Sequence, residues 1–202
     1  MLHDIKTIIF DLGGVVVDLE IDRVREAFCE IGMPRRAALM DPCDPAEINE
    51  RMERGELSWE EACDEMRRLD NRPEVTNEQI AWVYGEFLAR VAPAKIERID
   101  QLRREGYRLY VLSNTNRVAF EAVCRHFRNA GRDLEACFDE VFLSYRLKLL
   151  KPSPAIFEEV IRRTGIRPEE TLFIDDGARN AAAAASLGFR TYCPPTNGKW
   201  EF

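Results

Sequence analysis

The hydrophobic positions of this chain follow two different patterns. Short, nearly continuous apolar runs occur at 5–10 and again from about residue 109 onward, and glycine or polar residues end each of them. Such runs are typical of strands buried in a parallel sheet. The segments between the later runs repeat their apolar residues every three to four positions, as helices do. This alternation predicts a parallel sheet with helices on both faces.

The pattern predicts five strands and the helices that connect them. The strands are expected at 5–10, 109–113, 140–144, 171–174 and 190–192. The connecting helices are expected at 94–105, 117–128, from Pro154 to Gly165, and over the Ala-rich stretch that ends at Leu187. Gly106, Gly165 and Gly188 stand where these helices should end, because glycine readily adopts the left-handed backbone of a helix C-terminus.

The stretch from about 18 to 92 has no strand-like apolar run. Its apolar residues fall on helical faces instead, such as the face formed by Ile80, Val83, Tyr84, Phe87 and Leu88. Ser58 and Thr76 are each followed three residues later by Glu or Gln, which is the pattern of a capping box at a helix start. A turn is expected at 41–45, with Asp44 as the next N-cap. This stretch is therefore expected to form a bundle of four or five helices.

The two patterns together predict an α/β protein in two parts. A Rossmann-like core with helices on both faces of a parallel sheet would come from residues 1–17 and 93–202. An inserted all-helical cap would come from residues 18–92.

The first predicted strand runs directly into a lone carboxylate, Asp11, and then into Gly13 and Gly14. Open α/β sheets bind their ligands outside the carboxyl ends of their strands. A carboxylate there costs several kcal/mol if it is buried without a partner. From this stretch alone, Asp11 either binds a cation, reacts, or caps the following turn.

Composition excludes several classes of protein. The 202 residues include 46% hydrophobic and 32% charged residues, as in ordinary globular domains, and the net charge is −7. The chain has no Lys/Arg-rich block, so a nucleic-acid partner is not expected. Its apolar runs are too short to span a membrane, and residues 1–6 have no signal-peptide pattern. The six cysteines form no Cys-x-x-Cys pair, so we expect reduced thiols in a cytoplasmic protein.

Polar residues follow other predicted strands as well as the first. Ser113 and Asn114 end the second strand, and Asp175 and Asp176 end the fourth. Lys151 lies in the loop after the third strand. Because the carboxyl ends of parallel strands lie on one edge, these residues are expected to converge with Asp11.

This set of side chains suits phosphoryl transfer. Mg²⁺ prefers oxygen ligands and commonly takes one or two carboxylates together with a phosphate. A hydroxyl and an ammonium suit the remaining phosphate oxygens. A carboxylate that faces a neutralised phosphorus can attack it and form an aspartyl-phosphate. Taken singly, each of these residues has an ordinary interpretation as a turn, a cap or a solvated loop, and only their joint occurrence favours chemistry.

Four short motifs resemble those of the haloacid dehalogenase (HAD) superfamily and occur in the same order along the chain. They are Phe10-Asp11-Leu12-Gly13-Gly14-Val15-Val16, Val111-Leu112-Ser113-Asn114-Thr115-Asn116, Lys151-Pro152 and Phe173-Ile174-Asp175-Asp176. The helical insertion resembles a type-1 cap. Leu112–Asn116 and the segment Glu53-Arg54-Gly55-Glu56-Leu57-Ser58 resemble the bacterial sugar-phosphate phosphatases that include α-D-glucose-1-phosphate phosphatases.

The resemblance implies a role for each motif residue. Asp11 would be the nucleophile and a Mg²⁺ ligand, and Gly13 would offer its backbone carbonyl to the metal. Ser113 and Lys151 would hold the phosphoryl group of a small phosphorylated metabolite, with Asn114 beside it. Asp176 would be the main acidic metal ligand of the last motif. Asp175 would support it or reach the metal through a water.

The main departure from the family pattern is Gly13. Most phosphatases of the superfamily carry a second Asp at this position as the general acid and base, and losing such a group costs ~10²–10⁴ in rate. Asp18, Glu20 or a water would then have to replace it, or the leaving group would have to be good. A further departure is Lys148, where relatives often have Gly.

Two alternatives to a phosphatase stay open. A metal-independent dehalogenase or a phosphonatase-type hydrolase would also lack an Asp at position 13. A catalytically weak protein of the same fold would bind a phosphorylated ligand or a protein partner without turnover. The sequence leaves the exact substrate and the oligomeric state open.

Overall fold

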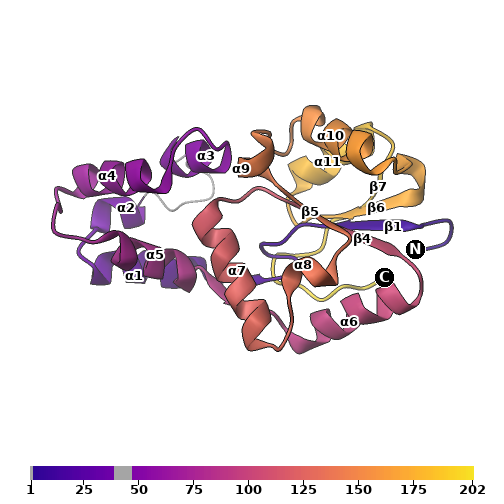
Figure 1. The fold of residues 1–202 in the computed structure, drawn as a ribbon, viewed down its shortest axis with the longest axis horizontal. Helices are drawn as coiled ribbons and strands as arrows, with labels where there is room; N and C mark the ends of the chain where they lie inside the picture. Colours follow the sequence, from indigo (N-terminus) through magenta and orange to yellow (C-terminus); the bar gives the residue numbers. More distant parts are fainter. Residues whose placement is uncertain (1, 39–46) are drawn as a thin grey trace.

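A five-stranded parallel sheet forms the centre of the computed structural model, which describes residues 2–38 and 47–202 (Figure 1). The strands lie in the order β5-β4-β1-β6-β7. Their bounds are β1 Thr7–Phe10, β4 Arg108–Ser113, β5 Glu140–Leu143, β6 Thr171–Ile174 and β7 Arg190–Tyr192. Each predicted strand is therefore present, and β1 is the middle strand because β4 and β6 both pair with it.

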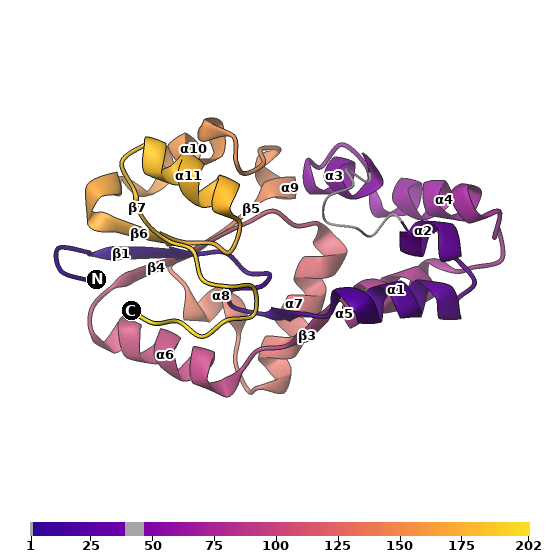
Figure 2. The same ribbon diagram turned by 180° about the vertical axis from the view of Figure 1, so that it is seen from behind.

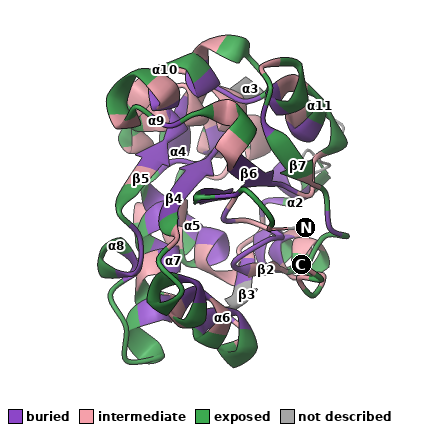
Figure 3. Cartoon of the chain, turned by 90° about the vertical axis from the view of Figure 1, so that its right-hand side faces the viewer, coloured by how far each residue is buried: buried purple, intermediate pink, exposed green. Residues whose placement is uncertain are grey.

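Helices cover both faces of this sheet, as the alternating pattern predicts. One face carries α6 (Pro93–Arg104), α7 (Arg117–Asn129) and α8 (Leu134–Cys137), and the other carries α10 (Pro154–Thr164) and α11 (Ala178–Ser186) (Figures 1 and 2). The short α9 (Ser144–Leu147) follows β5, and a 3₁₀ turn at Pro168–Glu170 precedes β6. Figure 3 shows β4 and β6 buried between these layers, whereas the edge strand β7 is largely exposed, as are the outer faces of the helices.

Successive residues of the strands point to opposite layers, which divides the core of the sheet in two. Ile8 and Phe10 pack in one cluster with residues of α6 and α7, such as Phe127. Ile9 points the other way and packs in a second cluster with Phe157 of α10. The continuous apolar run of β1 thus follows from burial on both faces.

The helices between the first strand and α6 form a separate body beside the sheet (Figure 1). They are α1 (Ile21–Glu30), α2 (Pro34–Ala38), α3 (Glu47–Glu53), α4 (Trp59–Asp70) and α5 (Asn77–Glu86). This body has its own apolar core, which includes Phe28, Met66 and Ile80. Both predicted capping boxes are present, at Ser58 before α4 and at Thr76 before α5.

Two short strands within the stretch 18–92 contradict the expectation that it contains none. β2 (Asp18–Leu19) and β3 (Leu88–Arg90) pair antiparallel where the chain leaves the sheet layer and returns to it. Leu88 therefore lies on a strand, and α5 ends at Glu86. Two- and three-residue strands are too short to produce a recognisable period, so the pairing arises from the two linkers lying side by side.

Ser144 is a smaller correction, because it begins α9 and does not end β5. The turn expected at 41–45, with Asp44 as a cap, lies outside the described residues. Five cysteines in the described part are free, namely Cys29, Cys63, Cys124, Cys137 and Cys193. No helix within 2–38 and 47–202 has the length and apolar character needed to cross a membrane.

Candidate active site

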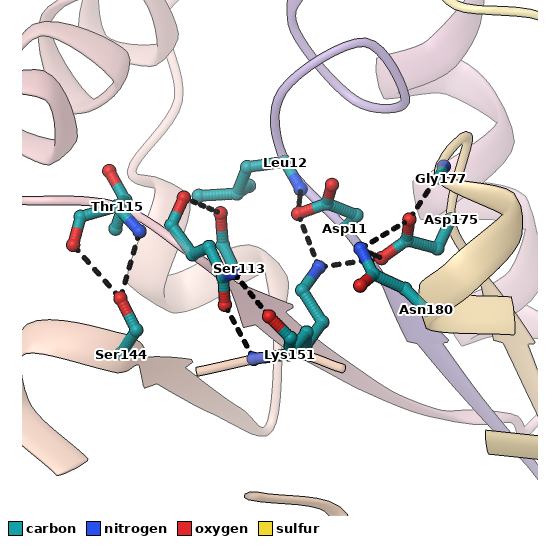
Figure 4. A network of polar contacts seen from close by, with 10 residues as sticks. Asp11, Leu12, Ser113, Thr115, Ser144, Lys151, Asp175, Gly177 and Asn180 are labelled. Atoms are coloured by element: carbon teal, nitrogen blue, oxygen red, sulfur yellow. Dashed lines mark hydrogen bonds and ion pairs between the residues drawn. The ribbon is translucent and has the colours of Figure 1, made fainter. Parts of the chain in front are cut away.

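The polar residues that follow the strands meet at one edge of the sheet. Asp11 follows β1, Ser113 is the last residue of β4, and Asp175 follows β6. Since these strands are parallel neighbours, their carboxyl ends lie together. Figure 4 shows Lys151 reaching into the same place from the loop after α9. The predicted convergence of the four motifs is therefore present.

Lys151 lies between two carboxylates. Its Nζ is 3.0 Å from Asp11 Oδ1 and 2.6 Å from Asp175 Oδ2 (Figure 4). The lysine is only 4% exposed, and a buried ammonium without partners would be costly. Burial by itself lowers the pKa of Lys151, but Asp11 and Asp175 outweigh it and raise the pKa above its usual value. Lys151 thus supplies a fixed positive charge beside Asp11.

Asp11 is held at the strand end by a local contact. Its Oδ1 accepts a hydrogen bond from the backbone N–H of Leu12 at 2.7 Å, in addition to the ion pair with Lys151. Burial raises the pKa of Asp11 to about 6, with Lys151 lowering it and Asp175 raising it further. Within the described residues no contact is found for the other oxygen, Oδ2. The carboxylate is therefore oriented and has one oxygen left for chemistry.

Asp175 is fully buried and anchors the site. Its Oδ1 accepts hydrogen bonds from the backbone of Gly177 at 2.8 Å and from the Asn180 amide at 3.0 Å. Its Oδ2 accepts from Lys151 and, at 3.1 Å, from the same amide. Four donor contacts explain how a charged group is tolerated at 0% exposure.

A third carboxylate completes a group that suits a metal ion. One oxygen each of Asp11, Asp175 and Asp176 lies within 4.8 Å of the other two. Thr196 in the C-terminal tail donates to Asp176 Oδ2 at 2.5 Å. Because three carboxylate oxygens converge at a partly open edge, the residues present fit a hard divalent cation such as Mg²⁺.

Asn114 has a more specific contact than the sequence indicates. Its amide nitrogen donates to the Lys151 carbonyl at 2.9 Å, and its amide oxygen accepts from the Lys151 backbone N–H at 2.9 Å. The side chain therefore fixes the backbone of the lysine loop. Nearby, Ser144 ties the start of α9 to the second motif through two hydrogen bonds with the backbone of Thr115, both 3.0 Å long.

Sequence reasoning missed Asn180 and Thr196. Asn180 stands in the first turn of α11, five residues after Asp175, and that proximity was the only available signal. Thr196 belongs to a tail that the sequence suggests is irregular, and nothing near it points to Asp176. Its contact exists because the tail folds back over the loop after β1, where Asn197 donates its backbone N–H to the Gly14 carbonyl at 2.7 Å.

The residues considered as substitutes for a second catalytic Asp lie elsewhere. Asp18 forms a 2.9 Å ion pair with Lys95, and the side chains of both are largely buried at the base of the helical body. Glu20 is exposed and precedes α1. Both residues belong to the linker that pairs as β2 with β3, and the Leu19 side chain between them packs against Gly13.

Comparison with known proteins identifies the family. A family model for haloacid dehalogenase-like hydrolases matches residues 5–188. The D-ribitol-5-phosphate phosphatase of Bacteroides thetaiotaomicron is 35% identical over 198 residues, which are 98% of this chain and 95% of that protein.

Solved structures give the same result. A HAD-family enzyme of B. thetaiotaomicron, in complex with magnesium and inorganic phosphate, matches with a TM-score of 0.89 and 34% identity, over 98% of both chains. A HAD-like hydrolase of Porphyromonas gingivalis matches with a TM-score of 0.85 and 38% identity, over 97% of this chain and 94% of that one. The chain therefore belongs to the haloacid dehalogenase-like hydrolases.

Proposed function

We propose that this hydrolase is a Mg²⁺-dependent phosphatase that cleaves a small phosphomonoester through an aspartyl-phosphate on Asp11. The observation that carries the proposal is the position of Lys151, buried between Asp11 and Asp175 with Asp176 close by. Two carboxylates around one ammonium leave the site negatively charged unless a cation joins it. A divalent cation would neutralise that charge and attract phosphate.

The metal would be held by Asp11, the backbone carbonyl of Gly13 and Asp176. Asp175 would support the site by holding Lys151 in place. When bound, Mg²⁺ neutralises phosphate oxygens and makes the phosphorus accessible to an anionic nucleophile. Asp175 is saturated by Lys151, Gly177 and Asn180, which suits a supporting role.

The remaining residues would bind the transferring group. The Ser113 hydroxyl and the Lys151 ammonium would each take a phosphoryl oxygen. Asn114 would act on the phosphate mainly through Lys151, because the Asn114 amide already binds the Lys151 backbone. Phosphoryl-transfer catalysis is mostly positioning and charge stabilisation, so these contacts are expected to carry much of the rate.

The substrate class follows from the relatives and the architecture. The 35%-identical relative acts on D-ribitol 5-phosphate, which supports a sugar phosphate or polyol phosphate here. Residues 18–92 would form the cap that closes over the core of 1–17 and 93–202 and selects the leaving group. The free cysteines and the absence of a spanning helix in the described part agree with a cytoplasmic location.

The test is phosphate release by the purified protein from a panel that includes ribitol 5-phosphate, glucose 1-phosphate and p-nitrophenyl phosphate. We expect turnover with Mg²⁺ and none after EDTA. Asp11→Asn keeps the shape of the side chain but removes the nucleophile, so it should lower kcat by about 10³ or more. Unchanged activity of Asp11→Asn would overturn the mechanism.

The same experiment separates the other hypotheses. A metal-independent dehalogenase would release halide from 2-haloacids in EDTA. A protein that only binds phosphorylated ligands would gain thermal stability with Mg²⁺ and phosphate, yet show no turnover. The three clustered carboxylates favour the metal-dependent phosphatase over both.

A further inference from the structure

Cleavage of an alkyl phosphate needs a proton donor at the leaving oxygen, because the departing alkoxide is a strong base. Near Asp11 the described core offers none that is free to donate. Position 13 is glycine, and Lys151 is held as an ammonium by two carboxylates. Asp18 pairs with Lys95 instead. The helical body is the other part of the protein that could supply a side-chain donor.

The C-terminal end of α3 is one of the parts of that body that contact the core, besides α5, which packs against α7. α3 packs against α9, and both ribbon views show the two helices side by side (Figures 1 and 2). The contact is close, because a Cβ on Gly55 would lie 2.5 Å from the Tyr145 carbonyl oxygen. Glu53 is the last residue of α3, and the lysine loop begins shortly after α9.

The Glu53 carboxyl lies near enough to the reacting groups for their charges to act on it. It is partly buried, and the charges of Asp11 and Lys151 both act on it. Burial and the negative charge of Asp11 raise the pKa of Glu53 to about 7. The carboxyl can therefore both hold and release a proton near neutral pH, as a general acid and base must.

Glu53 also differs from its neighbours on α3, because its charge has no partner in the described part of the chain. Glu50 pairs with Arg54 at 2.6 Å, and Arg51 pairs with Glu65 at 2.8 Å. These pairs account for two arginines that would otherwise neutralise Glu53. Within the described residues, α3 thus keeps one carboxyl without an ion pair, at the end of the helix that packs against α9.

We propose that Glu53 is the general acid and base of this enzyme, supplied by the helical body in place of a second aspartate after the nucleophile. The proposal rests on the proposed function, since it assigns a further group to the same reaction. It predicts that α3 must be docked on the core for catalysis.

In the first step an Asp11 oxygen forms a bond to phosphorus while the bond from phosphorus to the leaving oxygen breaks. The protonated Glu53 gives its proton to that oxygen, and the alcohol leaves. In the second step the Glu53 carboxylate takes a proton from a water molecule, whose oxygen attacks phosphorus. The bond to Asp11 breaks, inorganic phosphate leaves, and Glu53 is protonated again.

The test compares two substrates in the variant Glu53→Gln. One is the best alkyl phosphate of the panel, and the other is p-nitrophenyl phosphate, whose leaving group needs no proton. For the alkyl phosphate, kcat/KM should fall by ~10²–10⁴. For p-nitrophenyl phosphate, kcat/KM should stay within a few-fold of the wild type, because it reports only the steps through phosphorylation of Asp11.

The second step gives an independent readout. Without its base, Glu53→Gln should hydrolyse the aspartyl-phosphate slowly, so mixing with p-nitrophenyl phosphate should release a burst of one p-nitrophenolate per active site. The matched control is Glu56→Gln, which makes the same change at an exposed position three residues on and should behave as the wild type.

Three results would overturn the proposal: an unchanged kcat/KM for the alkyl phosphate, an equal loss for both substrates, or no burst. Loss of folded protein would lower kcat/KM for both substrates equally, so it cannot produce the expected difference between them. The outcomes also separate the two proposals. If the wild type cleaves no phosphate ester, the proposed function fails. If the wild type is active and the Glu53→Gln variant has the same kinetics, only the role of Glu53 is refuted.

Discussion

The ammonium of Lys151 is tolerated in the interior because two carboxylates lie within 3.0 Å of it. The same contacts leave Asp176 and one oxygen of Asp11 available for a cation. Each charged residue at the sheet edge therefore either neutralises a neighbour or remains available for a ligand. Glycines matter at this scale too, because they let the backbone pass close to these side chains.

Gly14 is the residue whose side chain would disturb the metal site most directly. It has a φ of +73°, and a Cβ on it would lie 2.4 Å from Asp176 Oδ2. Gly14→Ala should therefore displace Asp176 and weaken Mg²⁺ activation by at least about tenfold, measured as the Mg²⁺ concentration for half-maximal activity. The left-handed backbone adds strain of roughly 1–2 kcal/mol.

Gly131→Ala is the control for that strain. Its φ of +72° is nearly the same, but nothing lies within 4 Å of a Cβ there. It should lower stability without changing the Mg²⁺ requirement. If both variants keep the wild-type Mg²⁺ dependence, Asp176 does not hold the metal.

The raised pKa of Glu53 also predicts an effect on stability. A carboxyl with a higher pKa in the folded than in the unfolded chain opposes folding in its charged form, and this cost grows as pH rises from about 4.5 to about 7. In EDTA, Glu53→Gln should therefore raise the free energy of unfolding at pH 8 by about 1–3 kcal/mol and leave it unchanged near pH 4. Urea denaturation at the two pH values measures the difference, and an equal effect at both would contradict it.

At the scale of single elements, the sequence predicts strands well where they are buried on both faces. β1, β4 and β6 lie within two residues of their expected bounds, because their apolar runs are buried in the sheet. The short β2 and β3, and the one-turn helix α9, were not predicted. Such elements are stabilised by contacts with segments that are distant in sequence, and they are too short to show a hydrophobic period.

Helix α9 explains one of the departures in the sequence. Lys148 caps this helix in the left-handed conformation, with φ of +57° and ψ of +31°. Glycine adopts this conformation without the steric cost that a Cβ brings. Lys148→Gly should therefore stabilise the protein by about 0.5–1 kcal/mol, measured by urea denaturation, and a destabilised variant would show that the lysine side chain contributes contacts of its own.

At the scale of the whole molecule, the helical body and the sheet are joined by two linkers and by contacts across their boundary. β2 and β3 form the paired linkers, and Asn197 holds the first one by hydrogen bonds to the backbone N–H and carbonyl of Leu19, at 2.8 and 3.0 Å. On the other side, Gly55 rests on the backbone of α9. The placement of α3 against the core depends on that contact.

Gly55→Ala tests the placement. The added methyl group cannot fit against the Tyr145 carbonyl, so α3 should move away from the core. Since a displacement of about 1 Å can cost 10²-fold in rate, kcat/KM for an alkyl phosphate should fall by at least about tenfold. Gly131→Ala again controls for backbone strain, and equal activity of the two variants would show that the docking of α3 is not needed.

Local patterns along the chain by themselves determined which segments become strands and helices, and which polar residues end the strands. They predicted the convergence of Asp11, Ser113, Lys151 and Asp175, because parallel strands bring their carboxyl ends to one edge whatever the details of packing. Only the tertiary structure decided what each side chain contacts there. Asn114 turns to the lysine backbone, Thr196 reaches Asp176, and the charge of Asp11 acts on Glu53 in another part of the fold. These contacts join residues far apart in sequence, so no periodicity or motif records them, and they form only when the packed elements fix the distances between side chains.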